Sequence, residues 1–334
     1  MSEKSLIQKA AADFAAATLA PVSFVPEKTA EYTEDAVKEM AAKGFLKVAD
    51  LEEAAIVAEE FGKANASMAE VAVIANVTAS TLADYGAAAD GMTGYAVYEE
   101  GTSCGGVTAE KAGDAYKITG TKIAAALGGA ADQYIVIATL DGALAAFVVK
   151  AADAKAEKFD KLGLRSYPTA NLTFDAAPAV LLSADGAKVR AELNAKIDTL
   201  NCFVAAGIAD TACATSVEYA KTRVQFGAPI AKIPAVQFML ADIAAAKYIL
   251  EAVGEKALAA VMSGKDYIIP CACAKYQAAK SAFDAGTNCV QIHGGTGYSR
   301  EYPIERYYRE MKTLFTNTDY VDYPEKTISV DLLK

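Results

Sequence analysis

The sequence predicts an α+β fold in three successive parts: an N-terminal α-helical domain over residues 1–91, a middle antiparallel β domain over 92–186 and a C-terminal four-helix bundle over 187–334. Apolar residues recur with a helical period up to about Tyr85, alternate with polar residues in the middle part, and return to a helical period in the last part. The length of 334 residues suits two or three domains of roughly 100–200 residues each.

The N-terminal part is expected to hold three helical regions, over residues 4–19, 33–43 and 51–85. Gly44 ends the second region, because glycine accepts the left-handed conformation that closes many helices. The third region is expected to break near residues 63–67. Its Ala, Leu, Val and Ile spacing suits a helix that packs on several sides.

The middle part is expected to form short antiparallel strands. They cover residues 115–123 (a strand, a turn and a strand), 134–140, 143–150 and 171–174. Asp141-Gly142 separates two of them and supplies the residue types that a tight hairpin turn prefers, because glycine tolerates positive φ. The sequence therefore predicts a β domain with at least one two-residue hairpin.

Helical stripes return in the C-terminal part. One helix is expected over residues 203–222, and a second follows Pro234, with its apolar side running from 236 to 250. A third covers residues 267–292, and Pro303 stands where a fourth would start. Four helices of this length predict an antiparallel bundle.

Charge and hydropathy exclude several classes of protein. The net charge is −10 and the sequence pI is about 4.8, which argues against nucleic acid as a partner. A local basic pocket for a small phosphate-bearing ligand remains compatible with this charge. No run approaches the ~20 apolar residues of a membrane helix, so no membrane partner is expected. The first five residues resemble no signal segment, and the cytoplasm is the expected location.

Cysteine and histidine spacing predicts no metal site. There are six cysteines without a CxxC pair: Cys104, Cys202, Cys213, Cys271, Cys273 and Cys289. Cys271 and Cys273 form the one cluster and are interpreted as inert thiols, with redox or metal chemistry as the alternative. His293 is the only histidine. It is expected to pack or to form a hydrogen bond, and a catalytic role is the alternative.

Two C-terminal segments make the interpretation specific. Residues 222–230 read Thr-Arg-Val-Gln-Phe-Gly-Ala-Pro-Ile, and residues 291–298 read Gln-Ile-His-Gly-Gly-Thr-Gly-Tyr, followed by Arg-Glu-Met-Lys at 309–312. They resemble the two C-terminal signatures of the flavin-dependent acyl-CoA dehydrogenases. Lys-Leu-Gly-Leu-Arg at 161–165 resembles the middle domain of that family. The resemblance implies the family fold, FAD as cofactor and an acyl-CoA as substrate.

In that family FAD lies across a subunit interface, and these two signatures hold the adenine and diphosphate of the neighbouring subunit's FAD. The resemblance assigns FAD binding to six residues: Arg223, Gln225, Phe226, Gln291, Gly294 and Gly295. Their chemistry agrees, because a guanidinium offers phosphate a planar fork of donors and glycines let backbone N–H groups approach an anion. The alternative is that Arg223 caps a helix and Gly294-Gly295 is only a turn.

The family removes the substrate α proton with a Glu that must lie within hydrogen-bond reach of the α carbon. Ungapped alignment after Arg309 puts Thr318 at the usual base position. Some members place this Glu at the start of the first bundle helix, where alignment puts Leu200, with Asn201 beside it. Neither position carries a carboxylate, so the sequence predicts no confident catalytic residue. Asp319, one residue from the first position, is the candidate substitute.

The isoalloxazine half of the FAD site is also altered. The family loop that contacts flavin and substrate reads Tyr-Glu-Glu-Gly-Thr-Ser-Cys-Gly here, over residues 98–105. The strand element that normally supplies a Trp and a hydroxyl reads Ala124, Ala125 and Ala126, and the chain contains no Trp. The absence of this Trp and this hydroxyl removes stacking area and a hydrogen bond to the flavin. The alternative is that the three alanines are simple strand packing and make room for a different ligand.

The losses lie on one half of the FAD site and spare the other. This predicts a subunit of a heteromeric acyl-CoA dehydrogenase, without its own base, that completes the FAD site of a homologous catalytic subunit. FAD would be shared at the interface and nearly absent from the chain alone. A dimer or tetramer is expected, with an electron-transfer flavoprotein as a further partner. The alternatives are a self-sufficient homomeric enzyme with a displaced base, or a flavin-free scaffold.

Overall fold

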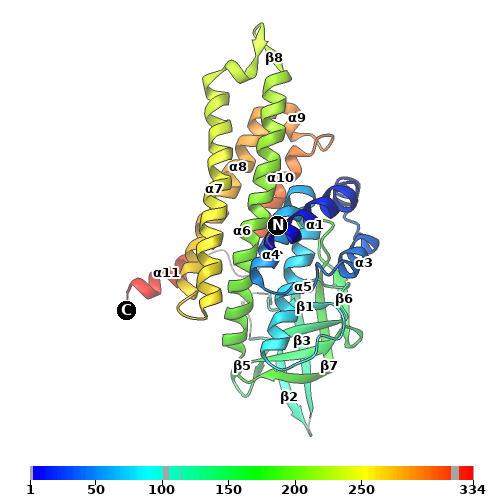
Figure 1. Cartoon of the computed structure of the whole chain (residues 1–334). Helices are drawn as coiled ribbons and strands as arrows, with labels where there is room; N and C mark the ends of the chain where they lie inside the picture. Colours follow the sequence, from blue (N-terminus) through cyan, green and yellow to red (C-terminus); the bar gives the residue numbers. More distant parts are fainter. Residues whose placement is uncertain (1–2, 101–104, 114, 317–322, 334) are drawn as a thin grey trace.

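The computed structural model describes residues 3–100, 105–113, 115–316 and 323–333. Figure 1 shows the long C-terminal helices standing side by side, with a small hairpin at one end of the bundle and the sheet toward the other end. The N-terminal helices lie beside the middle of the bundle. This arrangement separates the hairpin end from the region where helices meet the sheet, and these two regions carry the candidate site.

The N-terminal helices follow the predicted pattern. They are α1 (Glu3–Phe14), a π-helical turn (Ala15–Leu19), α2 (Val25–Thr29), α3 (Glu34–Ala42), α4 (Leu51–Ala64) and α5 (Ala66–Asp84). The predicted break is confirmed at Asn65, whose φ of −157° leaves the helical region. The Asn65 side chain accepts a hydrogen bond from the Met68 N–H at 3.2 Å. It therefore caps α5, since Asn satisfies a free N–H of the first helical turn.

The sheet of the middle part has seven strands in the order β1-β3-β2-β4-β5-β7-β6. They are β1 (Thr93–Ala96), β2 (Thr108–Ala112), β3 (Ala115–Ala126), β4 (Gln133–Leu140), β5 (Ala143–Lys150), β6 (Ala154–Lys158) and β7 (Thr169–Ser183). The expected hairpin is confirmed, because β4 and β5 pair antiparallel across Asp141 and Gly142, which both have positive φ.

Two expectations for the sheet were wrong. The sheet is mixed rather than antiparallel, because β1 and β2 each pair parallel with β4. The chain leaves β1, forms β2 and β3, and returns to place β4 beside β1 in the same direction. Residues 115–123 form one continuous strand instead of two, because Gly120 makes a bulge at φ +132° where a turn was expected. A Cβ there would lie 3.1 Å from Val107 Cα, so the close approach requires glycine.

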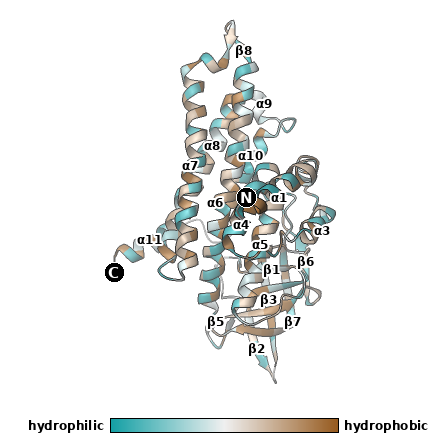
Figure 2. Cartoon of the chain, in the orientation of Figure 1, coloured by the Kyte–Doolittle hydropathy of each residue, from teal (hydrophilic) through white to brown (hydrophobic). Residues whose placement is uncertain are grey.

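The C-terminal part forms the predicted bundle. Its helices are α6 (Gly186–Thr222), α7 (Pro234–Ser263), α8 (Ile268–His293) and α10 (Ile304–Leu314), with short α9 (Gly295–Tyr298) and a last helix α11 (Tyr323–Leu332). Helix α6 starts well before the expected residue 203, because Asp185 caps it by accepting a hydrogen bond from the Lys188 N–H at 3.0 Å. Figure 2 shows hydrophilic and hydrophobic residues interleaved along α6 and α7.

Helix α6 is the centre of the molecule. It packs against α4 and α5 on one side and against α7 and α8 on the other. Its contact with α4 is close: a Cβ added at Gly62 would lie 2.5 Å from Val204 O. Helices α5 and α6 are long and apolar enough to cross a membrane by length and composition, contrary to the expectation from sequence, but 83% and 67% of their most apolar stretches are buried inside the chain. Their apolar composition is that of core helices, because most of their side chains pack against other parts of the chain.

A buried ion cluster joins the three parts of the chain. Arg309 of α10 donates to Glu27 of α2 at 3.1 Å and to the Leu162 carbonyl at 2.8 Å, and it pairs with Glu305 one turn earlier. Next to it, the Gly163 N–H donates to Thr313 Oγ1 at 3.0 Å. The 161–165 segment is therefore attached directly to α10, which ends where the family base loop would begin.

Candidate functional site

The first signature segment forms the hairpin at the far end of the bundle (Figure 1). Helix α6 ends as the Arg223 N–H donates to the Tyr219 carbonyl at 2.8 Å, and strands β8 (Val224–Gln225) and β9 (Ala228–Pro229) follow. The turn is Phe226-Gly227, with φ of 52° and 77°. Phe226 is 97% exposed, and Arg223 and Gln225 are also exposed. An aromatic side chain that is almost fully exposed at the tip of a hairpin is a candidate for contact with another molecule.

The second signature segment lies at the end of α8. Gln291, Gly294 and Gly295 are exposed, and Gly294 has φ 57° and ψ −136°, which suits glycine. A Cβ added at Gly294 or Gly295 would meet no atom within 4 Å. Gly295 therefore has neither a positive φ nor internal crowding to require glycine. Gly295 thus presents open space beside its exposed backbone.

The fold brings the two signature segments together. The Tyr219 ring, one turn before Arg223, stacks on the His293 ring with centroids 4.3 Å apart. His293 is buried, and its Nδ1 lies 2.9 Å from the Cys289 carbonyl oxygen. Burial lowers the pKa of His293, so the ring is neutral at pH 7. His293 thus joins α6 to α8 behind the exposed residues, which agrees with packing rather than catalysis.

A groove of about 850 Å³ continues from Gln291 along α8 and α10. Its walls include Tyr298, Arg300 and Tyr308. Tyr298 is 85% exposed. We call the exposed set Arg223, Gln225, Phe226, Gln291, Gly294 and Gly295, together with this groove, the hairpin-end surface. It offers a guanidinium, amides and open glycine backbone, a donor set that fits a diphosphate.

The two family base positions carry no described carboxylate. Leu200 is fully buried inside α6, and Asn201 next to it donates from Nδ2 to the Leu314 carbonyl at 3.3 Å. Thr318 and Asp319 lie outside the described residues. The nearby Asp198 is buried and paired with Lys275 at 3.3 Å.

Ala124 and Ala126, the positions of the missing flavin contacts, face a small cavity between the sheet and the helices. We call it the interdomain cavity, and it is lined by Glu70, Ile74, Tyr95, Val97, Tyr98, Ala124, Ala126, Tyr167, Thr169 and Ile197. Its volume is about 20 Å³, space for about one water molecule. Tyr95 and Tyr167 are each only 4% exposed. The described side chains thus close this space, and it is far too small for a three-ring flavin.

The described ends of the loop over residues 98–105 are attached to the sheet beside this cavity. Glu99 pairs with Lys122 of β3, which is fully buried and also donates to the Val97 carbonyl at 3.0 Å. Glu99 also accepts hydrogen bonds from the N–H groups of Gly105 and Gly106. Burial favours the neutral acid, but the Lys122 contact and these hydrogen bonds outweigh it and lower the pKa of Glu99. Residues 101–104 of the loop lie outside the described chain.

Glu70 is a carboxyl in this cavity that sequence reasoning missed. It lies on α5 with 1% exposure, and its Oε2 has no hydrogen-bond partner among the described residues. Burial raises the pKa of Glu70 to about 8, against opposing effects of Lys161 and the Asn201 side chain. A Glu in an alanine-rich helix is usually a surface residue, so no pattern in the sequence marked it.

Three of the described cysteines, Cys202, Cys271 and Cys289, are buried free thiols. Burial raises the pKa of Cys271 to about 11, so it is protonated at neutral pH, and its sulfur lies 3.5 Å from Thr199 Oγ1. Cys273 is exposed. These observations agree with the expectation of an inert thiol at Cys271.

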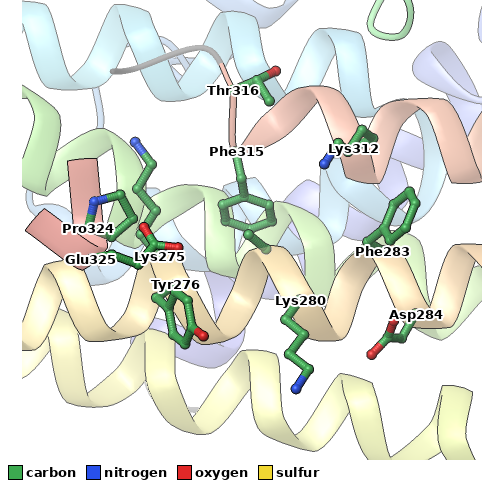
Figure 3. Close-up of a pocket in the computed structure, with 11 residues that line it drawn as sticks. Lys275, Tyr276, Lys280, Phe283, Asp284, Lys312, Phe315, Thr316, Pro324 and Glu325 are labelled. Carbon is green, nitrogen blue, oxygen red and sulfur yellow. The ribbon is translucent and has the colours of Figure 1, made fainter. Parts of the chain in front are cut away.

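A further groove of about 310 Å³ lies between α8, the end of α10 and α11. Figure 3 shows Phe315 over α8, with Tyr276 and Lys280 pointing away from it. Lys312 Nζ lies 4.9 Å from the centre of the Phe283 ring. None of the site residues predicted from the sequence lines this groove, so it is separate from both regions described above.

The fold is that of the acyl-CoA dehydrogenases, and comparisons with known proteins agree. The family model for the acyl-CoA dehydrogenase C-terminal domain matches residues 199–315. An acyl-CoA dehydrogenase of Bacillus subtilis is 30% identical over 93% of this chain and 92% of its own length. The chain belongs to the acyl-CoA dehydrogenase family.

Two further similarities concern Megasphaera elsdenii. Its short-chain specific acyl-CoA dehydrogenase is 36% identical over 59% of this chain, and the alignment spans 55% of that protein. The solved structure of butyryl-CoA dehydrogenase from the same organism superposes with a TM-score of 0.93 at 26% identity, over 100% of this chain and 99% of that one. The α+β fold of the family, with helical parts on either side of a mixed sheet, is therefore confirmed.

Proposed function

We propose that this chain is a subunit of a heteromeric FAD-dependent acyl-CoA dehydrogenase and that it completes the FAD site of a homologous catalytic partner. The observation that carries the proposal is the contrast between two regions. The hairpin-end surface is open and has donors suited to a diphosphate, whereas the interdomain cavity is reduced to about 20 Å³. A chain that served only itself would need both regions open.

The residues of the hairpin-end surface fit the adenosine diphosphate part of FAD. Arg223 would hold the diphosphate with its forked guanidinium, assisted by Gln225 and Gln291, while Gly294 and Gly295 would let backbone N–H groups approach it. Phe226 would pack against the partner subunit or the cofactor. When bound, FAD supplies hydride acceptance, and the proposal leaves the ring and the catalytic base to the partner. An electron-transfer flavoprotein would be the acceptor of the assembled enzyme.

The proposal is tested by isolating the chain from native cells with its partners and counting flavin per chain. We expect a complex with a second acyl-CoA dehydrogenase chain and about half a flavin per chain, whereas this chain expressed alone is nearly colourless. One tightly held FAD per chain in the protein expressed alone would overturn the proposal. It would favour a self-sufficient homomeric enzyme instead.

A further inference from the structure

The outer side of α7 is apolar and exposed. Its inner side packs against α6 and α8, with Val236, Ile243 and Leu250 buried, and Figure 1 shows the helix at one edge of the bundle. On the other side Phe238 is 69% exposed and Tyr248 is 71% exposed. A helix that is apolar on more than one side is normally covered on each of them. The outer side of α7 is therefore a candidate contact surface.

The exposed residues of this side follow a seven-residue pattern. Steps of three and four residues in alternation reach Phe238, Ala241, Ala245, Tyr248, Ala252, Glu255, Ala259 and Met262, and all eight are exposed. All but Glu255 are apolar. Apolar residues at such steps form the contact line between paired helices, because they return to one face about every 3.5 residues. We call these eight residues the α7 seam.

The α7 seam can pair with a second copy of itself. In a two-fold pair, a residue that contacts a second residue is contacted by it in turn, so two antiparallel α7 helices match in reversed order. A pair centred near residue 250 places Phe238 level with Met262, whose thioether packs well against an aromatic ring. It also places the large Tyr248 level with the small Ala252. Shape therefore favours the antiparallel arrangement.

The other four seam positions are compatible with the same arrangement. Ala241 lies level with Ala259, and two methyl groups let the helix backbones approach closely. Glu255, the charged member, lies level with Ala245, whose small side chain leaves the carboxylate room to reach water. No seam position therefore opposes the pairing.

Two charges beside the α7 seam complement each other in this arrangement. Asp242 and Lys256 are exposed and stand seven residues before and seven residues after Ile249. A two-fold axis at Ile249 therefore places Asp242 of one copy level with Lys256 of the other, and this contact occurs twice. Asp242 accepts a hydrogen bond from the neutral Asn288 amide at 3.5 Å, which leaves its charge available. Opposite charges at these positions select this register against others.

A groove beside the α7 seam extends the surface onto α8. It has a volume of about 450 Å³, and its walls include Asp242, Ala245 and Ile249 of α7 and Lys280 and Asp284 of α8. The two α8 side chains are exposed and carry opposite charges. The surface offered to a second copy therefore includes both helices.

We propose that two copies of this chain associate through the α7 seam as an antiparallel, two-fold pair. Helix α7 has 30 residues and rises about 1.5 Å per residue, so the two hairpin ends lie roughly 45 Å apart. Both hairpin-end surfaces then stay open to catalytic partners. The inference goes beyond the proposed function, since this contact needs neither flavin nor a partner subunit.

The charge pair gives the sharpest test, which is sedimentation equilibrium of the full chain purified alone, over a series of concentrations. The wild type should form dimers. Asp242→Lys and Lys256→Asp each bring like charges together twice, so each should weaken the pairing roughly 10–100-fold. An equal mixture of the two variants should pair again, because each copy then meets opposite charges. The variant with both changes should also pair.

A second pair of variants tests the apolar part of the contact. Ala252→Glu places a carboxylate against Tyr248 of the other copy and should abolish the pairing, since a buried unpaired charge is costly. Ala214→Glu makes the same change at an exposed position of α6 and should leave the pairing as it is. Circular dichroism checks the fold of each variant.

A wild-type chain that stays monomeric at every concentration would overturn the proposal. So would a pairing that the two Ala→Glu variants weaken equally, or one that does not return when the charge variants are mixed. A native complex with one copy of each chain, in which the catalytic partner covers Ala252, would also overturn it but would leave the proposed function intact. One tightly held FAD per chain in a wild-type dimer would overturn the proposed function and leave the α7 contact in place.

Discussion

At the hairpin end of the bundle Phe226 is 97% exposed and Gly295 has open space around its backbone, whereas at the interdomain cavity Tyr95 and Tyr167 are buried and Lys122 is fully buried. The first region presents exposed side chains to the outside, and the second has buried side chains that fill the space between the sheet and the helices. The resemblance to the family implies that regions of both kinds contact FAD across a subunit interface. Under the proposed function, this contrast means that the open region serves the FAD of a partner subunit, while the closed region holds no flavin of its own.

The largest effect on stability is expected at the buried Glu99–Lys122 ion pair beside the interdomain cavity. Lys122→Met would leave Glu99 buried without its cation, which costs about 3–5 kcal/mol of folding free energy. Denaturant unfolding measures this loss. Lys117→Met is the matched control, because Lys117 lies on the same strand and is exposed. Equal losses in the two variants would mean that the Glu99–Lys122 pair does not hold the closed region together.

A smaller effect is expected at the open region. A charge-assisted hydrogen bond contributes about 1.5–3 kcal/mol, so Arg223→Ala should weaken FAD binding to the assembled complex roughly 10–150-fold. Arg223→Lys should recover only part of this loss, because an ammonium lacks the planar fork. FAD titration measures the affinity, and circular dichroism checks the fold.

The control for this experiment is Lys221→Ala, since Lys221 is an exposed cation on the last turn of α6. It should change FAD affinity little. Unchanged affinity in a folded Arg223→Ala complex would mean that the signature is only structural here. The scaffold alternative would then become the preferred function.

Much of the fold could be predicted because it depends on local sequence. Asn65 interrupts a helical region and caps the next helix, and Asp141-Gly142 makes the hairpin turn. The parallel pairing of β1 with β4 could not be predicted, because it joins strands separated by another pair of strands. The early start of α6 was missed although Val189, Leu193 and Ile197 recur every four residues and form a buried helical stripe in its first turns.

For the candidate site the sequence showed which residue types were present and which were missing, but not what fills the space. Ala124 and Ala126 predict lost flavin contacts, yet only the structure shows tyrosines and Glu70 around that position. These residues come from α5, β1 and the segment before β7, and only the tertiary structure brings them together. The assignment of FAD contacts to the hairpin-end surface stays a prediction.

The smallest effect is expected at the candidate substitute base. If the partner supplies the base, Asp319→Ala should leave the activity of the assembled complex almost unchanged. Steady-state kinetics of the complex with an acyl-CoA measures this. A loss of about 10²–10⁴-fold, the range for a general base, would assign the role to Asp319 and would place catalysis in this chain.

The central claim is that this chain keeps the half of the FAD site that serves a neighbour and has closed the half that would serve itself. The most direct measurement is the flavin absorbance of the chain purified alone, followed by titration of FAD into the chain with and without its partner. We expect almost no flavin on the chain alone and about one FAD for each pair of unlike chains. Tight binding of one FAD to each chain in the absence of a partner would contradict it.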